Sequence, residues 1–175
     1  MRLVLLVLVG WLFAALLGPL WRLVPARVPA PDVALLLAVY LGVTARRGLA
    51  GPVAGGVAIG WIAAICSGAP AALGALVAGL LVLIARAATL RLLVGGGAFV
   101  AALAGAAAVA ATLLGLAARL AWEAPIGRAG DEAAHAVTLA LVCGIVAPLW
   151  FKFCRGLDAR LDRRARDTAR AGFGR

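Results

Sequence analysis

The feature that most constrains this chain is a succession of long apolar segments that contain almost no charge. Arginines, prolines and Gly-Pro pairs separate six such segments: 3–20, 32–45, 48–66, 71–88, 92–118 and 133–153. As α-helices with a rise of about 1.5 Å per residue, five of them reach roughly 27–40 Å and can span a bilayer core about 30 Å thick. The sequence therefore predicts an all-α integral membrane protein.

The composition excludes a water-soluble domain. Hydrophobic residues make up 65% of the 175 residues and the mean hydropathy is +1.08, more than polar surface could cover in a soluble domain of this length. The net charge is +10, and every basic residue except Lys152 is an arginine. Such an excess is typical of cytoplasmic loops that lie on anionic lipid, so we expect no nucleic-acid partner.

The distribution of basic residues predicts which loops are cytoplasmic. The positive-inside rule places the loop with Arg46 and Arg47, the loop 86–91 and the C-terminal tail on the cytoplasmic side. This holds for six crossings and for five, so charge leaves the side of the N-terminus open. The bias toward arginine and alanine indicates a GC-rich bacterial genome, so we expect a bacterial inner membrane. We favour six transmembrane helices, the second one short. The predicted parts are a membrane domain over residues 1–153 and a basic cytoplasmic tail over residues 154–175.

The short segment 32–45 begins with the most informative acid of the chain. Its length as a helix is only about 21 Å, and the prolines upstream prevent a helical extension. Asp32 is predicted to cap this helix by accepting a bond from the N–H of residue 34 or 35. It can also lie at the floor of an outward-facing depression, with Arg22 and Arg27 as candidate counter-charges. These residues and Tyr40 form a hypothetical partner- or lipid-binding site.

Small residues and one proline predict how the helices pack. The third segment carries two overlapping G-x-x-x-G pairs, formed by Gly51, Gly55, Gly56 and Gly60. Such pairs allow close approach of helix backbones in lipid, either inside the bundle or between two copies of the chain, and we favour the inside of the bundle. In the sixth segment Pro148 should kink the helix by displacing the carbonyl of residue 144, and Gly144 leaves space for the distortion.

The basic tail is predicted to be an amphipathic helix followed by a disordered end. Its default role is to lie on anionic lipid at the inner membrane surface, and the alternative is to dock a cytoplasmic partner. The arginines that we expect at this surface are Arg46, Arg47, Arg155, Arg160, Arg163, Arg164 and Arg166.

The sequence offers no constellation for catalysis. His135 is the sole histidine, and the chain contains no P-loop, no G-x-S-x-G, no H-E-x-x-H and no C-x-x-C. We therefore expect no enzyme, metal or cofactor. Residues 67–70, Ser-Gly-Ala-Pro, are explained by a tight turn between the third and fourth segments without any ligand.

The order of several motifs resembles the rod shape-determining protein family MreD. Pro31-Asp32 opens an L-L-x-x-V-Y-L-G run, two arginines follow, a Gly-rich helix ends in Ser67-Gly68, and the last helix carries Gly144, Pro148, Trp150-Phe151 and a basic tail. The similarity extends from residue 31 to about residue 164. One departure is Ala64, at a position where the family often has an acid, so a role of that acid does not carry over.

The resemblance implies a non-enzymatic scaffold of the bacterial cell-elongation machinery, which directs rod shape and peptidoglycan synthesis. Its partners would be an MreC-like bitopic protein, the MreB filament, RodA and a class B penicillin-binding protein. It also implies the six-helix fold of the substrate-binding components of energy-coupling-factor transporters. The alternative function is therefore a vitamin-type substrate-binding membrane component of such a transporter.

Overall fold

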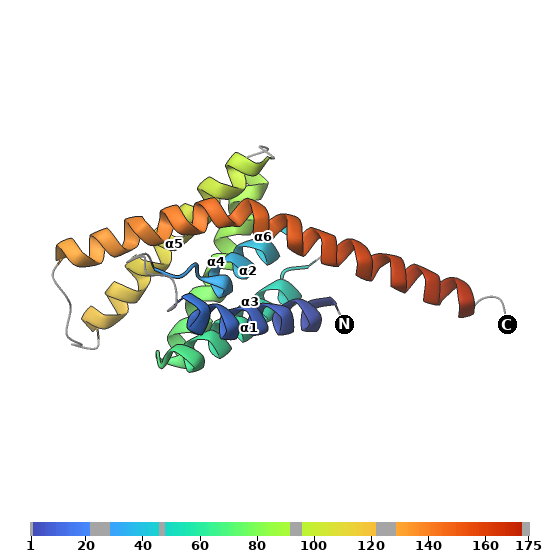
Figure 1. Cartoon of the computed structure of the whole chain (residues 1–175), viewed down its shortest axis with the longest axis horizontal. Coiled ribbons are helices and arrows are strands. Elements are labelled where there is room, and N and C mark those ends of the chain that lie inside the picture. Colours follow the sequence, from blue (N-terminus) through green and yellow to red (C-terminus); the bar gives the residue numbers. More distant parts are fainter. Residues whose placement is uncertain (1, 22–28, 46–47, 92–95, 122–128, 173–175) are drawn as a thin grey trace.

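The computed structural model describes residues 2–21, 29–45, 48–91, 96–121 and 129–172, and the side chains of residues 2, 129, 162 and 164–172 are not described. Every regular element in these residues is an α-helix (Figure 1). In chain order the helices are α1 (Arg2–Trp21), α2 (Val33–Thr44), α3 (Ala50–Ser67), α4 (Ala71–Arg91), α5 (Gly97–Ala121) and α6 (Ala129–Gly172). The predicted all-α class is confirmed.

Five helices are long and apolar enough to cross a membrane, namely α1, α3, α4, α5 and α6. The remaining helix, α2, has 12 residues and would be only about 18 Å long. The chain is thus a multi-pass membrane protein. Its second helix is shorter than the 18 residues required of a membrane-spanning helix. A sixth crossing by α2 stays a prediction.

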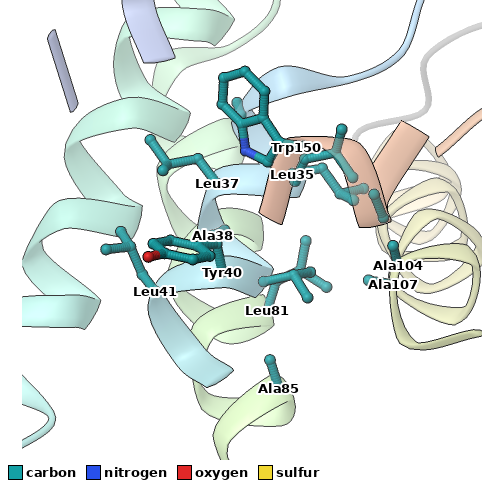
Figure 2. Close-up of a cluster of buried hydrophobic side chains, with 14 of the residues drawn as sticks. Leu35, Leu37, Ala38, Tyr40, Leu41, Leu81, Ala85, Ala104, Ala107 and Trp150 are labelled. Atoms are coloured by element: carbon teal, nitrogen blue, oxygen red, sulfur yellow. The ribbon is translucent and has the colours of Figure 1, made fainter. Parts of the chain in front are cut away.

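The short helix α2 lies at the centre of the bundle. Residues 33–42 are all buried, and α2 contacts each of the other five helices. Side chains of α2, α4, α5 and α6 meet there in one cluster, in which Leu37 and Leu81 are almost fully buried (Figure 2). An apolar helix without a polar face is stable where protein surrounds it on all sides. In contrast, α1 exposes large apolar side chains such as Val4 and Leu8, as a lipid-facing helix does.

The turn between α3 and α4 has the geometry of a Schellman motif. Gly68 follows α3 in the left-handed conformation, with φ 73°, which glycine adopts without strain. The N–H of Ala69 donates to the carbonyl of Ala64 at 2.9 Å, and the N–H of Gly68 donates to that of Ile65 at 3.3 Å. The tight turn predicted for residues 67–70 is confirmed.

Glycines allow the helices of each hairpin to approach closely. A Cβ atom added at Gly74 in α4 would lie 2.7 Å from the carbonyl oxygen of Gly60 in α3, and one at Gly56 would collide with Val82 of α4. Across the other hairpin, a Cβ at Gly144 in α6 would lie 3.3 Å from the carbonyl oxygen of Ala101 in α5. Gly56 and Gly60 of the predicted G-x-x-x-G pairs and Gly144 of the predicted kink therefore face neighbouring helices of the same chain.

The last helix, α6, is much longer than the predicted segment 133–153. It runs for 44 residues without a break at residue 154, so the backbone of the basic tail continues the same helix as far as Gly172. Residues 154–171 are rich in alanine, arginine and leucine and contain no proline, a composition that favours continued helix. Pro148 lies inside α6, and the helix changes direction about halfway along its length (Figure 1).

The fifth helix begins later than predicted, at Gly97 rather than at residue 92. Gly96 immediately before it has φ 141°, a conformation that ends regular helix, and its carbonyl accepts the N–H of Val100. Residues 92–95 lie outside the described residues. Among the described residues, Gly96 and Gly97 therefore mark the start of α5.

Candidate ligand cavity at the start of the second helix

A cavity of about 690 Å³ lies at the N-terminal end of α2. Residues 29–35, which include the first three residues of α2, line it together with residues from α1, α3, α4, α5 and α6. Nearly all of the lining side chains are apolar and many are small. Among the described residues that line it, the polar side chains are those of Asp32, Ser67 and His135. A volume of 300–1,000 Å³ with apolar walls and few polar groups is typical of small-molecule sites.

Asp32 both caps α2 and lines the cavity. Its Oδ1 atom accepts a hydrogen bond from the N–H of Leu35 at 3.0 Å, and its backbone is extended, so the predicted N-cap is confirmed. Pro31 follows Ala30, and a residue before proline is disfavoured in helical conformation. This explains why α2 cannot start earlier. The side chain of Asp32 is exposed to the cavity, so the capping role and a place at the floor of a depression coexist.

The other two polar groups come from helix ends at the same end of the bundle. Ser67 ends α3, and its hydroxyl donates to the carbonyl of Ala64 at 3.1 Å. His135 lies near the start of α6 and is exposed. Sequence reasoning did not place either residue in the site. The signal available for both was their position at segment ends that meet the same side of the membrane.

Ala64 also lines the cavity, where it is buried in the wall formed by α3. Asp32 is the cavity's one carboxylate among the described residues, and the wall at Ala64 is apolar.

An ion pair joins α5 to α6 at the same end of the bundle. Arg119 donates to Glu132 at 3.1 Å, and both side chains retain solvent exposure. Asp131 and Glu132 occupy the first turn of α6, where the helix dipole favours acids. Arg22 and Arg27, the predicted counter-charges of Asp32, lie outside the described residues.

Tyr40 lies at the opposite end of α2 and does not line the cavity. The eight positions between Asp32 and Tyr40 correspond to about 12 Å along the helix axis. The Tyr40 side chain is fully buried, its hydroxyl donates to Asp158 of α6, and its ring packs edge-on against Phe151 at a centroid distance of 5.2 Å. The structure therefore separates Tyr40 from the site in which the sequence had placed it.

A second, wholly apolar cavity of about 430 Å³ lies between α1 and α3. Side chains of α1, including Val4, Leu8 and Trp11, form one wall. Gly51 and Gly55, with two alanines of the same helix, form the other. We call this cavity the α1–α3 groove. Half of the predicted glycine pattern thus faces α1, while Gly56 and Gly60 face α4.

The predicted membrane-surface arginines are described only in part. Arg155, Arg160 and Arg163 are exposed on α6. The side chains of Arg164 and Arg166 lie outside the described residues, as do Arg46 and Arg47 entirely. In the part of the chain that the structure describes, no cluster of three or more His, Cys, Asp or Glu side chains could hold a metal ion.

These features define an all-α, multi-pass membrane protein with one apolar cavity that contains a carboxylate and one groove that contains no polar group in its described walls. No known protein family, no curated protein and no solved structure is matched by this chain.

Proposed function

We propose that this protein is a non-enzymatic membrane scaffold of the bacterial cell-elongation machinery, as its resemblance to the MreD family implies. The α1–α3 groove is the observation that carries the proposal. Lipid tails are as apolar as helix surfaces, so helices associate in membranes through close packing against small residues. A groove with a wall of Gly51, Ala54, Gly55 and Ala58 suits the single transmembrane helix of an MreC-like bitopic partner.

The outer edge of the groove offers the contact area that such a partner would bury. Val4 and Leu8 are 68% and 56% exposed, and Trp11 is 42% exposed. Large apolar side chains beside a small-residue surface provide ridges for a second helix to pack between. This arrangement supports a binding surface rather than a catalytic one.

The C-terminal part of α6 supports a scaffold in a second way. It extends beyond the other helices as a continuation of a transmembrane helix (Figure 1), and it exposes Arg155, Arg160 and Arg163. In the predicted topology this part is cytoplasmic, where it would meet anionic lipid, the MreB filament or the cytoplasmic segments of RodA and a class B penicillin-binding protein.

The experiment compares two exposed alanines on transmembrane helices. Ala54 lines the α1–α3 groove, whereas Ala72 on α4 lines neither cavity. Ala54→Trp should abolish most copurification of an MreC-like protein, and rod-shaped cells that carry it as their sole copy should become round. Ala72→Trp should leave both unchanged. Equal copurification of the partner by the two variants, with normal cell shape, would rule out the groove and the scaffold function.

The cavity at Asp32 favours a second candidate, the substrate-binding component of a vitamin-type energy-coupling-factor transporter. Its volume suits a small solute, and a carboxylate, a hydroxyl and an imidazole converge on it. This candidate requires association with an ATPase module. Copurification of such a module together with tight binding of a water-soluble vitamin would favour it over the scaffold.

A further inference from the structure

The cavity at the start of α2 combines apolar walls with an acid that has no basic partner among the described residues. The carboxylate of Asp32 accepts the capping bond from the N–H of Leu35, and the ion pair of Arg119 with Glu132 does not involve it. A carboxylate has about four lone-pair sites, so capping leaves acceptor capacity directed at the cavity. The N-terminus of a helix carries only about half a positive charge. Among the described residues, the N-terminus of α2 offsets only part of the charge of Asp32, so this carboxylate can accept a cationic group.

This charge determines which head group the cavity can accept. A carboxylate within apolar surroundings is stabilised by a cation that also donates hydrogen bonds, and an ammonium group does both. An anionic head group would be repelled by Asp32. Ser67 and His135 also line the cavity and provide further groups for hydrogen bonds to polar atoms of a ligand.

The walls of the cavity are mostly apolar and adjoin exposed apolar side chains of α1, which suits the apolar part of a membrane ligand. Phe13 of α1 packs edge-on against Trp150 of α6 at a centroid distance of 5.2 Å. Further toward the α2 N-terminus, Leu17 and Gly18 of α1 and Leu139 of α6 border the cavity itself. Where Leu17 and Gly18 of α1 face Leu139 of α6, the space between the two helices is thus part of the cavity. Lipid-facing side chains of α1 adjoin this space.

Two glycines show that space remains for an occupant. Gly18 and Gly115 both line the cavity, and a Cβ atom added at either position would meet no heavy atom within 4 Å. The cavity therefore has room beyond the side chains that line it, with a carboxylate among them.

We propose that the cavity binds the amine head group of a membrane lipid, with the ammonium on Asp32 and the upper part of an acyl chain between α1 and α6. The occupant is an ethanolamine-type phospholipid rather than an anionic one. This inference goes beyond the scaffold function and does not depend on it.

The test measures lipid retained by the full-length protein in mild detergent, by native mass spectrometry during titration with phosphatidylethanolamine or phosphatidylglycerol of the same acyl chains. Wild-type protein should retain phosphatidylethanolamine about tenfold more tightly. Asp32→Asn keeps the helix cap but removes the charge, and it should abolish this preference. Asp131→Asn is the matched control, since Asp131 is exposed at the same end of the bundle outside the cavity, and it should change nothing.

A second pair of variants tests the volume. Gly115→Leu should fill the cavity and lower retention of phosphatidylethanolamine several-fold. Gly97→Leu, at a glycine that also has open space but lies outside the cavity, should not. Equal retention of the two lipids by wild-type protein, or unchanged retention by Gly115→Leu, overturns the proposal. Displacement of the lipid by an equal concentration of soluble glycerophosphoethanolamine also overturns it, because the site would then select a soluble solute. Copurification of an MreC-like partner is not part of this readout, so the two proposals fail separately.

Discussion

The two ends of α2 are built in opposite ways. At the N-terminal end, Asp32 caps the helix and faces a cavity of about 690 Å³. At the C-terminal end, Gly42 is pressed against α4, Tyr40 is fully buried and bonded to Asp158, and the hydroxyl of Thr44 donates to the carbonyl of Tyr40 at 2.8 Å. One short apolar helix is thus fixed by packing at its C-terminal end, which we call the closed end. It leaves space at its N-terminal end beside the cavity, which we call the open end. The difference indicates that the space is local and that the closed end holds α2 in place.

The sharpest test of this difference is to add one methyl group at each end of α2, at Gly42 in the helix itself and at Gly115 of α5, which lines the cavity. A Cβ atom at Gly42 would overlap the carbonyl oxygen of Val82 and lie 2.7 Å from Cβ of Ala85, so Gly42→Ala should destabilise the protein by about 1–3 kcal/mol. Gly115→Ala at the cavity should instead be neutral or stabilise by up to about 1 kcal/mol, because alanine favours helix. Thermal unfolding in detergent, followed by circular dichroism, measures both. Similar unfolding temperatures for the two variants would contradict the comparison.

The bond at the closed end should matter next most. Tyr40→Phe keeps the edge-on packing against Phe151 but removes the hydrogen bond to Asp158, which should cost about 1 kcal/mol. Because this bond joins α2 to the beginning of the basic part of α6, limited trypsin digestion at Arg160 or Arg163 should also become faster. Unchanged digestion with unchanged stability would show that packing alone holds this end. Phe151→Leu, which removes the ring packing and keeps the hydrogen bond, is the complementary variant.

At the open end, Asp32 is expected to contribute less to stability than to binding. Asp32→Ala removes the helix cap and should cost about 1 kcal/mol, whereas Asp32→Asn should be close to neutral because asparagine caps equally well. If the carboxylate serves the cavity, both substitutions should reduce partner or ligand binding more than they reduce the protein level in membranes. A fall in protein level alone, restricted to Asp32→Ala, would show that Asp32 acts only as a cap. Immunoblotting of membranes beside the binding measurement separates these outcomes.

The open end was largely predictable from the sequence and the closed end was not. The prolines before Asp32 and the short apolar run after it indicate a capped helix that starts below its neighbours, and the structure has both features. Tyr40, which we had grouped with Asp32, lies at the closed end, because eight residues of helix separate the two by about 12 Å along the axis. Its partner Asp158 lies 118 residues away, and only the path of α6 brings the two together.

Helix boundaries were predictable where glycine or proline marks them and unpredictable where charge alone does. The turn at Gly68 follows from the residues present. The continuity of α6 did not follow, because the tail was predicted as a separate amphipathic helix on the membrane surface, although arginine and alanine also favour an uninterrupted helix. A hydrophobic pattern reports where a helix leaves the lipid, and it does not report where the helix ends.

The smallest expected effect concerns the ion pair beside the cavity. Glu132→Gln removes the partner of Arg119, but both side chains are partly exposed, at 24% and 54%, so the loss should be at most about 0.5 kcal/mol and should shrink in high salt. The pair joins α5 to α6 next to the open end, so it should not change lipid retention as Asp32→Asn does. An effect of Glu132→Gln on lipid retention as large as that of Asp32→Asn would mean that the general charge of this end selects the head group. Asp32 alone would then not account for recognition of the lipid head group.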